Sequence, residues 1–206
     1  MKVTSIILAG GKNRRLGRNK ALEVFEGTTL IERVVKRLSP LSGQTLVITA
    51  MKREDLPPLD GVELVPDIKA GLGPLGGIYS GLVASSLPYS IVVACDMPFL
   101  NTELLRHMIE LIGDYDAVVP RLENGMVEPL HAVYARKSLE VLKSQLDDNS
   151  LKVHVLLEKL NVRYLEREES SRIDPRLLSF FNINRQSDLD QAVSLAENEN
   201  LSDCPH

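Results

Sequence analysis

A short apolar run at the start of the chain does most to limit the folds open to it. Residues 3–8 read Val-Thr-Ser-Ile-Ile-Leu and lead directly into Ala9, Gly10 and Gly11. Such a run is typical of a strand that is buried on both faces of a largely parallel sheet. Because glycine has no Cβ, the backbone after this strand can approach a ligand closely. The opening therefore predicts a buried strand that ends at a binding loop.

The loop after this strand is rich in cations. Five positive side chains fall within nine residues, at Lys12, Arg14, Arg15, Arg18 and Lys20. Gathering them is costly unless something negative lies among them, which favours a nucleoside triphosphate as the ligand. The loop is not a Walker loop, since no Gly-Lys-Ser/Thr closes it, and it lacks the Gly-x-Gly-x-x-Gly spacing of dinucleotide sites. The alternative is a solvated basic turn.

Lys20 and Arg15 are our candidates for the catalytic cations of this loop. Lys20 precedes the apolar pair Ala21-Leu22, whereas the other cations could equally be surface residues. A cation placed where charge develops on a transferring phosphoryl group stabilises the transition state more than the ground state. We therefore expect Lys20 and Arg15 to neutralise the triphosphate.

The first half of the chain continues as an alternation of apolar runs and amphipathic segments. Further strands are expected at 45–49, 62–65, 90–94 and 117–119, and helices at 29–38, 75–86 and 102–112. This alternation predicts an α/β fold, a Rossmann-like three-layer α/β/α sandwich around a mostly parallel central sheet. Asn101 is expected to cap the third of these helices.

The second half is less regular. Strands are expected at 130–134 and 162–165, a strand-like run at 180–184, and helices at 137–146, 151–160 and 187–197. No repeat, low-complexity tract or linker divides the chain. We therefore expect a single domain over residues 1–198, followed by a polar, frayed tail at 199–206.

Composition argues against several other classes of protein. The 206 residues carry a net charge of −4, which does not favour general binding to nucleic acid. Cys95 and Cys204 lie far apart and form neither a disulfide framework nor a metal-ligand pattern. No stretch resembles a signal peptide or a membrane-spanning helix. We therefore expect a soluble cytoplasmic protein that does not associate with membranes.

A carboxylate stands at the end of the expected strand at 90–94. The sequence there reads Ala94-Cys95-Asp96-Met97-Pro98. Ligands of open α/β sheets bind at the carboxyl ends of the strands. An Asp at this point could hold Mg²⁺, which takes oxygen ligands and bridges phosphate oxygens. The alternative is a helix cap, but Asn101 is better placed for that role.

Glycines are concentrated between positions 71 and 81, where the chain has five of them. Gly76 and Gly77 fall at the start of an expected helix, where glycine destabilises unless the backbone must pass close to something. A purine base or a ribose would meet that need, and so would tight packing of the helix on the sheet. Asp67 could accept hydrogen bonds from the base or the ribose, or could cap a turn.

Three polar residues in the second half are candidates for lining a substrate. His131 ends the sequence Glu128-Pro129-Leu130-His131, and a lone histidine is more often structural or substrate-lining than an acid–base catalyst. Asn182 and Asn184 alternate along the strand-like run and so would lie on one side of it. They could contribute to the metal or phosphate site, or cap the last helix.

Taken together, these motifs resemble those of the molybdenum cofactor guanylyltransferases. The matching segments are Leu8–Gly11 with Arg15-Leu16-Gly17 and Lys20, then Gly73–Gly77, Cys95–Pro98, Glu128–His131 and Asn182–Asn184. They occur in the order found in the family and span residues 5 to about 195. Many nucleotidylyltransferases share the first motif, but its combination with Gly-Pro-Leu-Gly-Gly and Glu-Pro-Leu-His is more specific.

The resemblance implies a single nucleotidyltransferase domain of the nucleotide-diphospho-sugar transferase type. It also implies Mg²⁺-dependent transfer of GMP from GTP to the phosphate of Mo-molybdopterin, with release of pyrophosphate. Transient contact with proteins that deliver the molybdenum cofactor would fit this role. The residues implied to meet the nucleotide are Leu8, Ala9, Gly10, Gly11, Lys20, Asp67, Gly76, Gly77 and Asp96, with Asp96 also holding the metal.

Two other functions stay open. Some family members carry Asn after the second strand, where this chain has Thr49-Ala50-Met51, so a relative that transfers CMP remains an alternative. Transfer of a nucleotide to a sugar or polyol phosphate is a similar alternative. A non-catalytic nucleotide-binding module is more distant, because both Lys20 and Asp96 are retained.

Overall fold

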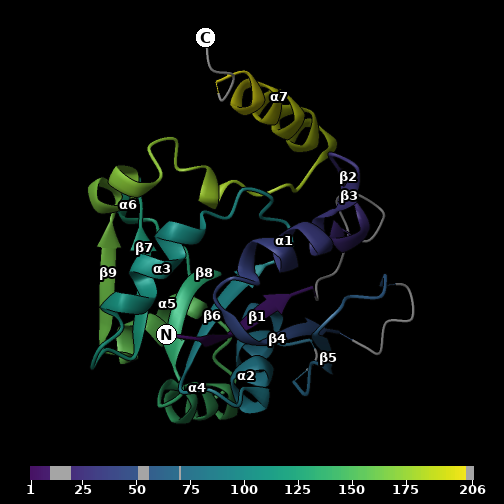
Figure 1. Cartoon of the computed structure of the whole chain (residues 1–206). Coiled ribbons are helices and arrows are strands. Elements are labelled where there is room, and N and C mark those ends of the chain that lie inside the picture. The colour runs from purple at the N-terminus through teal and green to yellow at the C-terminus, as the bar shows by residue number, and fades with distance from the viewer. Residues whose placement is uncertain (10–19, 51–55, 70, 203–206) are drawn as a thin grey trace.

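The protein is a three-layer α/β/α sandwich, as the sequence predicts (Figure 1). The computed structural model describes residues 1–9, 20–50, 56–69 and 71–202, with side chains up to residue 197. The cation-rich loop at residues 10–19 lies outside the described residues, and so do the glycines and Arg15 expected to contact a nucleotide there.

Within the described residues, seven strands form the central sheet in the order β5-β4-β1-β6-β8-β7-β9. Their bounds are β1 (Val3–Leu8), β4 (Ser42–Thr49), β5 (Val62–Pro66), β6 (Tyr89–Ala94), β7 (Ala117–Arg121), β8 (His131–Ala135) and β9 (Val162–Glu166). All neighbouring pairs are parallel except those that β8 makes with β6 and β7. Because β1 is buried along its whole length, its apolar run needs cover on both faces, which the two helical layers supply.

Helices cover both faces of the sheet. They are α1 (Leu30–Leu38), α2 (Gly73–Ala84), α3 (Thr102–Leu111), α4 (Ser138–Asp147), α5 (Val153–Lys159), α6 (Arg167–Ile173) and α7 (Gln186–Ser202). The Thr29 side chain caps α1 in a reciprocal capping box with Glu32. Asn101 caps α3, since its side-chain oxygen accepts from the backbone N–H groups of Glu103 and Leu104.

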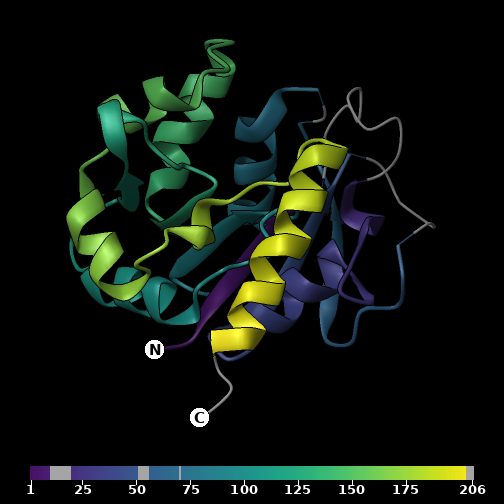
Figure 2. The same cartoon turned by 90° about the horizontal axis from the view of Figure 1, so that it is seen from above.

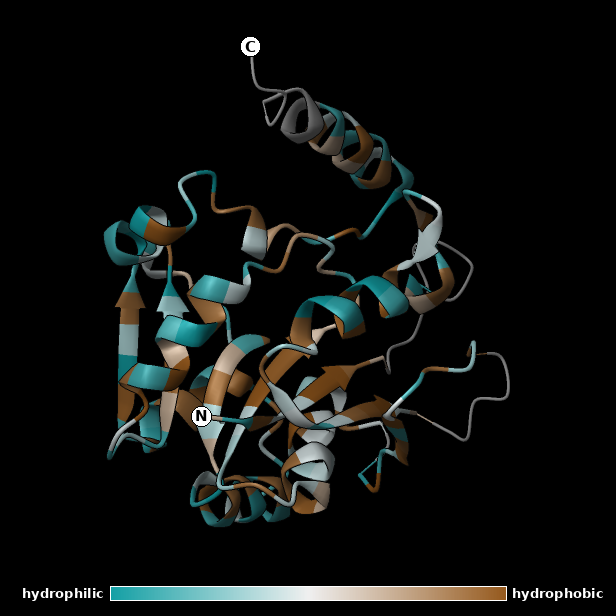
Figure 3. Cartoon of the chain, in the orientation of Figure 1, coloured by the Kyte–Doolittle hydropathy of each residue, from teal (hydrophilic) through white to brown (hydrophobic). Residues whose placement is uncertain are grey.

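The alternation of side chains along the strands divides the core into two clusters. On one face Ile7, Val47 and Val93 pack against α1 and α3. On the other face Ile6 and Leu46 pack against α2, α4 and α5. In Figure 3 the central strands are mostly hydrophobic, while the flanking helices alternate between hydrophobic and hydrophilic residues, as amphipathic cover requires.

The last helix, α7, extends the fold at one end of the sheet (Figures 1 and 2). It packs against a third cluster that includes Phe25, Leu30, Phe99 and Ile183. Phe25 belongs to a small hairpin of β2 (Val24–Phe25) and β3 (Thr28–Thr29) that the sequence did not predict. The helix ends at Ser202 rather than at residue 197 as expected.

Residues 180–184 do not form the expected strand. Leu178–Phe180 is a 3-10 helix (η3), and the chain then reaches α7 without regular secondary structure. One backbone hydrogen bond ties this run to the sheet region, from Ile183 N to Asp96 O at 2.9 Å. A strand would need a continuous ladder of such bonds, so the apolar pattern reflects burial against α7 instead.

The sheet places the ends of most strands on one edge. Six of the described strands run in the same direction and finish there, and the antiparallel strand β8 begins there at His131. This edge is where an open α/β sheet binds ligands. In the described part of the chain, no helix is both long enough and apolar enough to span a membrane.

Candidate functional site

Three side chains from distant parts of the sequence meet at this edge. The Lys20 Nζ donates to Asp96 Oδ2 at 2.9 Å and to Asn184 Oδ1 at 2.6 Å. The Lys20 and Asp96 side chains are 20% and 14% exposed, so the ion pair is sheltered but can be reached from solvent. Both residues were expected at the nucleotide from the sequence, and the structure brings their side chains together, while their action on one triphosphate remains a prediction.

Backbone contacts fix the position of each of these residues. Lys20 begins a short 3-10 helix, η1 (Lys20–Leu22), whose turn is closed by a hydrogen bond from Glu23 N to Lys20 O at 3.1 Å. Asp96 follows β6, and the bond from Ile183 N to its carbonyl joins it to the run that carries Asn184. The site is therefore assembled by β6, η1 and the segment before α7.

Asp188 stabilises the turn that presents Asn184. Its Oδ2 accepts from Asn184 N at 2.7 Å and from Arg185 N at 2.9 Å. These backbone hydrogen bonds lower the pKa of the Asp188 carboxyl from its usual value. The carboxylate thus caps the first turn of α7, where negative charge is favoured by the helix dipole.

The two oxygens of the Asp96 carboxylate differ in their hydrogen bonding. Oδ2 accepts from Lys20, whereas Oδ1 is buried and has no hydrogen-bond partner among the described residues. An unpaired buried carboxylate oxygen is costly, and a hard cation would satisfy it. Within the described residues no group of three or more His, Cys, Asp or Glu side chains could hold a metal ion. A metal here would take one protein carboxylate and complete its shell with ligand oxygens and water.

Leu8 and Ala9 lie at the end of β1, which pairs with β6, the strand that leads to Asp96. Both are nearly fully buried at the end of β1. The Leu8 carbonyl accepts from Cys95 N at 3.2 Å, and Ala9 N donates to Ile48 O at 2.9 Å. The Leu8 carbonyl and the Ala9 amide are therefore used within the sheet, and contact between these residues and a nucleotide remains a prediction.

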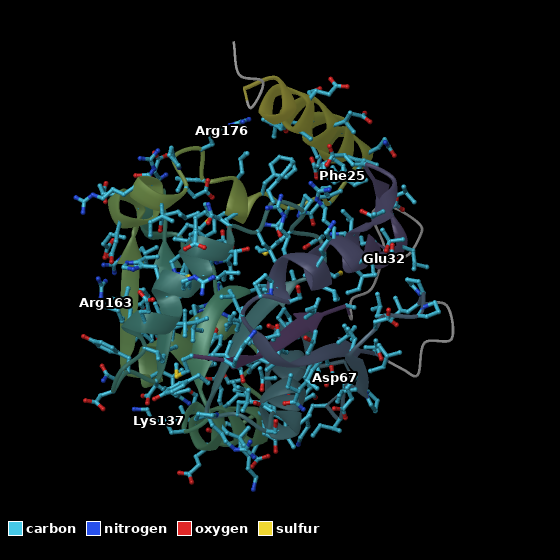
Figure 4. All side chains as sticks on the ribbon, in the orientation of Figure 1. Phe25, Glu32, Asp67, Lys137, Arg163 and Arg176 are labelled. Atoms are coloured by element: carbon cyan, nitrogen blue, oxygen red, sulfur yellow. The ribbon has the colours of Figure 1, made fainter. Side chains whose placement is uncertain are left out.

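Asp67 lies at the same edge, after β5 (Figure 4). Its Oδ1 accepts from Ser80 Oγ at 2.7 Å and from Lys69 N at 3.0 Å, which closes a turn. The turn-capping role considered from the sequence is therefore confirmed. Contact between Asp67 and a nucleotide remains a prediction.

The glycines of α2 let the helix pack closely on its neighbours. A Cβ on Gly76 would lie 2.7 Å from Lys69 O, and one on Gly77 would lie 3.1 Å from the Leu8 side chain. Contacts this short leave little or no room for a methyl group. Close packing thus accounts for both glycines, and the predicted contact with a base or a ribose is a separate question that their packing does not decide.

His131 lies inside the protein rather than on a substrate surface. Its side chain is fully buried, with Nε2 at 2.6 Å from Ser179 Oγ and the ring packed on Phe180 at a centroid distance of 4.8 Å. Burial lowers the pKa of His131 to about 4, so the ring is neutral at pH 7. A substrate could reach His131 only by displacing these neighbours, and the structural interpretation of this histidine fits better.

Asn182 and Asn184 do not share a partner. The Asn182 side-chain nitrogen donates to Phe180 O at 3.0 Å, while Asn184 reaches Lys20. The expectation that both face one side of a strand is wrong because this run is not a strand. Asn184 alone joins the site through contacts in the described structure.

Glu128, part of the matched motif Glu128–His131, is a polar residue at the same edge to which the sequence alone assigns no role. It precedes Pro129 in the loop that enters β8, and it is about half-buried, which raises the pKa of its carboxyl. A charged residue directly before a proline and an apolar strand was the signal available in the sequence. Because β8 and β5 lie on opposite sides of β6 in the sheet, the Glu128 carboxyl lies on the side of Asp96 away from Asp67.

Comparison with known proteins places the chain in a family. Residues 5–163 match the family described as the MobA-like NTP transferase domain. A protein of Pelotomaculum thermopropionicum named probable molybdenum cofactor guanylyltransferase is 35% identical over 96% of this chain and 95% of its own length. A molybdenum cofactor guanylyltransferase of Desulfosudis oleivorans is 36% identical, over 92% of this chain and 94% of its own length.

Solved structures give the same result. The molybdopterin-guanine dinucleotide biosynthesis protein A of Archaeoglobus fulgidus superposes with a TM-score of 0.79 at 31% identity, covering 95% of this chain and 99% of that one. The 2-C-methyl-D-erythritol 4-phosphate cytidylyltransferase of Thermus thermophilus shares the fold, with a TM-score of 0.70 at 20% identity over 96% and 100% of the two chains. This chain belongs to the MobA-like NTP transferase family.

Proposed function

We propose that this protein transfers GMP from GTP to the phosphate of Mo-molybdopterin, forming the guanine dinucleotide and releasing pyrophosphate. The observation that carries the proposal is the meeting of Lys20 and Asp96, 2.9 Å apart, at the carboxyl edge of the sheet. Both the names of full-length relatives and the family match support the choice of substrates.

The reaction needs no nucleophile from the protein. An oxygen of the acceptor phosphate attacks the α-phosphorus of GTP, the bond from that phosphorus to the bridging oxygen breaks, and pyrophosphate leaves. A phosphate monoester is already ionised near pH 7, so positioning and electrostatic stabilisation suffice. Lys20 would lie against the triphosphate oxygens, where its charge counts most as the leaving group develops. Arg15 would add a second cation.

Asp96 fits the role of a magnesium ligand because its buried Oδ1 lacks a partner among the described residues. When bound, Mg²⁺ would neutralise triphosphate charge and polarise the phosphoryl oxygens. The direct pair between Lys20 and Asp96 would then weaken, since both groups would bind the nucleotide complex. Asn184 would keep the Lys20 ammonium in place through its own hydrogen bond.

The two substrates would approach from opposite sides of Asp96. Leu8, Ala9, Gly10 and Gly11, with Asp67, Gly76 and Gly77, would form the guanosine side. The strands beyond β6 in the sheet, which are β8, β7 and β9, would form the acceptor side, together with Glu128 in the loop before β8. A cytoplasmic location and transient contact with proteins that deliver the molybdenum cofactor fit this function.

A mass-spectrometric assay tests the proposal. The protein is incubated with GTP, Mg²⁺ and molybdopterin, and we expect a product that contains molybdopterin and GMP, together with one equivalent of pyrophosphate. A parallel incubation with CTP, and a comparison of GTP and CTP as thermal stabilisers, separates guanylyl from cytidylyl transfer. The proposal fails if neither product nor pyrophosphate forms with GTP.

A further inference from the structure

Arg33 of α1 connects the two halves of the candidate site, although it is not itself part of it. Its Nε donates to the carbonyl oxygen of Pro98 at 2.9 Å, and Pro98 lies on the loop that follows Asp96. Its Nη2 forms an ion pair with Glu26 at 2.8 Å, at the tip of the hairpin that follows Lys20. One guanidinium therefore binds both segments that supply the Lys20–Asp96 pair.

Aromatic packing supports the same connection. The Arg33 guanidinium lies over the Phe25 ring, 4.6 Å from its centroid. The Phe25 ring in turn meets Phe99 edge-on, at a centroid distance of 5.5 Å. Figure 4 labels Phe25 where the hairpin approaches α7. Phe25 is almost completely buried, so the hairpin and the loop after Asp96 are held together by packing as well as by Arg33.

The hairpin transmits this constraint to Lys20 through the backbone. Leu30 N donates to Glu23 O at 2.9 Å, which closes the base of the hairpin, and Glu23 N donates to Lys20 O at 3.1 Å. The turn at the hairpin tip is tight, with Glu26 at a φ of 48° and Gly27 at 77°. A short hairpin of this kind has little freedom to move independently of its base.

We propose that Arg33 is a positioning residue that fixes the distance between the Lys20 ammonium and the Asp96 carboxylate. The inference rests on the proposed function of that pair. Charge-assisted hydrogen bonds and stacking suit arginine for this task, because its planar group can bind a carbonyl, a carboxylate and a ring at once. A displacement of about 1 Å in reacting groups can cost about 100-fold in rate.

Steady-state kinetics on three variants tests this role. We expect Arg33→Ala to lower kcat for GMP transfer by about 10-fold or more, with a smaller change in KM for GTP. Arg33→Lys should restore part of kcat, since it keeps the charge but not the planar fork. Arg136→Ala is the matched control, because Arg136 also donates to a backbone carbonyl, that of Ser85, but follows β8 at the opposite edge of the sheet. Its kcat should stay within about twofold of the wild type.

A second readout does not depend on activity. The ¹⁵N-resolved NMR signal of the Lys20 ammonium, assigned from its loss in Lys20→Arg, should shift or broaden in Arg33→Ala and stay unchanged in Arg136→Ala. The inference is overturned if that signal is unchanged in Arg33→Ala, or if Arg136→Ala lowers kcat as much as Arg33→Ala does. If the wild type makes no product, the proposed function fails, and the NMR comparison still decides the role of Arg33.

Discussion

Acid should destabilise this protein through one buried side chain, His131. Burial lowers its pKa in the folded state to about 4, against 6.5 for an unperturbed histidine. Above pH 6.5 the His131 ring is neutral in both the folded and the unfolded states, so it does not make the stability depend on pH. As the pH falls below 6.5, the unfolded state takes up the proton first and is stabilised relative to the folded state.

The size of the effect follows from the gap between these two pKa values. Each unit of pKa corresponds to about 1.4 kcal/mol, so the gap amounts to about 3 kcal/mol in the free energy of unfolding. The loss begins as the pH passes below 6.5 and is complete once it falls below about 4. Set against a typical total of about 5–15 kcal/mol, this is a large fraction of the stability of a domain.

Urea denaturation between pH 7 and pH 4.5 measures this dependence. His131→Gln removes the titrating group and keeps a side chain able to hydrogen-bond to Ser179, so its stability should fall with acid by about 2–3 kcal/mol less than that of the wild type. His107→Gln is the control, because His107 is partly exposed beside Glu169 and should leave the extra acid loss in place. If the wild type and His131→Gln lose stability in parallel over this range, the reasoning about His131 is wrong.

Three further changes test the packing and the site. Gly81→Ala should lower the free energy of unfolding by about 1–3 kcal/mol in urea denaturation, because the new Cβ would lie 2.4 Å from the Ile6 side chain; an unchanged or higher midpoint would contradict this. Asn101→Ala should cost about 1 kcal/mol in the same assay through the lost cap of α3, and a loss below about 0.3 kcal/mol would count against it. Asn184→Ala should lower kcat for GMP transfer by about 10-fold, since Lys20 loses one of the two hydrogen bonds that it donates to described residues; turnover equal to the wild type would exclude a role for Asn184.

The layers of the fold could be predicted because the relevant signals are local. Residues 3–8 form β1 with the predicted bounds, and all six, including the polar Thr4 and Ser5, are buried inside the covered sheet. The capping of α3 by Asn101 was readable for the same reason, because a cap depends on the next few residues alone. The position of Asp96 at the carboxyl edge of the sheet followed from one topological rule about strand ends.

The features that the sequence did not reveal depend on contacts between distant residues. Residues 180–184 carry a strand-like pattern, but Phe181 and Ile183 pack with α7 and the hairpin, and Phe180 joins the core between the sheet and α3. The sequence left His131 open as a structural or a substrate-lining residue, and the approach of Ser179 and Phe180 from far along the chain buries it. Such burial has no local signature, because it is set by tertiary packing.

The Gly76-Gly77 pair shows a different limit on what can be inferred from a sequence. Two explanations, contact with a nucleotide and close packing on the sheet, predict the same residue at the same position. The structure confirms close packing through Lys69 and Leu8. The sequence could not have separated the two explanations, because glycine, which has no Cβ, lets the backbone approach a ligand and a neighbouring strand equally well.

The most direct test of the central claim is the rate of GMP transfer from GTP by two near-isosteric variants, Lys20→Met and Asp96→Asn. If both side chains act on the same triphosphate, each variant should lose about 100-fold or more in kcat. Both should keep the far-UV circular dichroism spectrum of the wild type and a cooperative melting transition. Turnover within about threefold of the wild type in either folded variant would contradict the account.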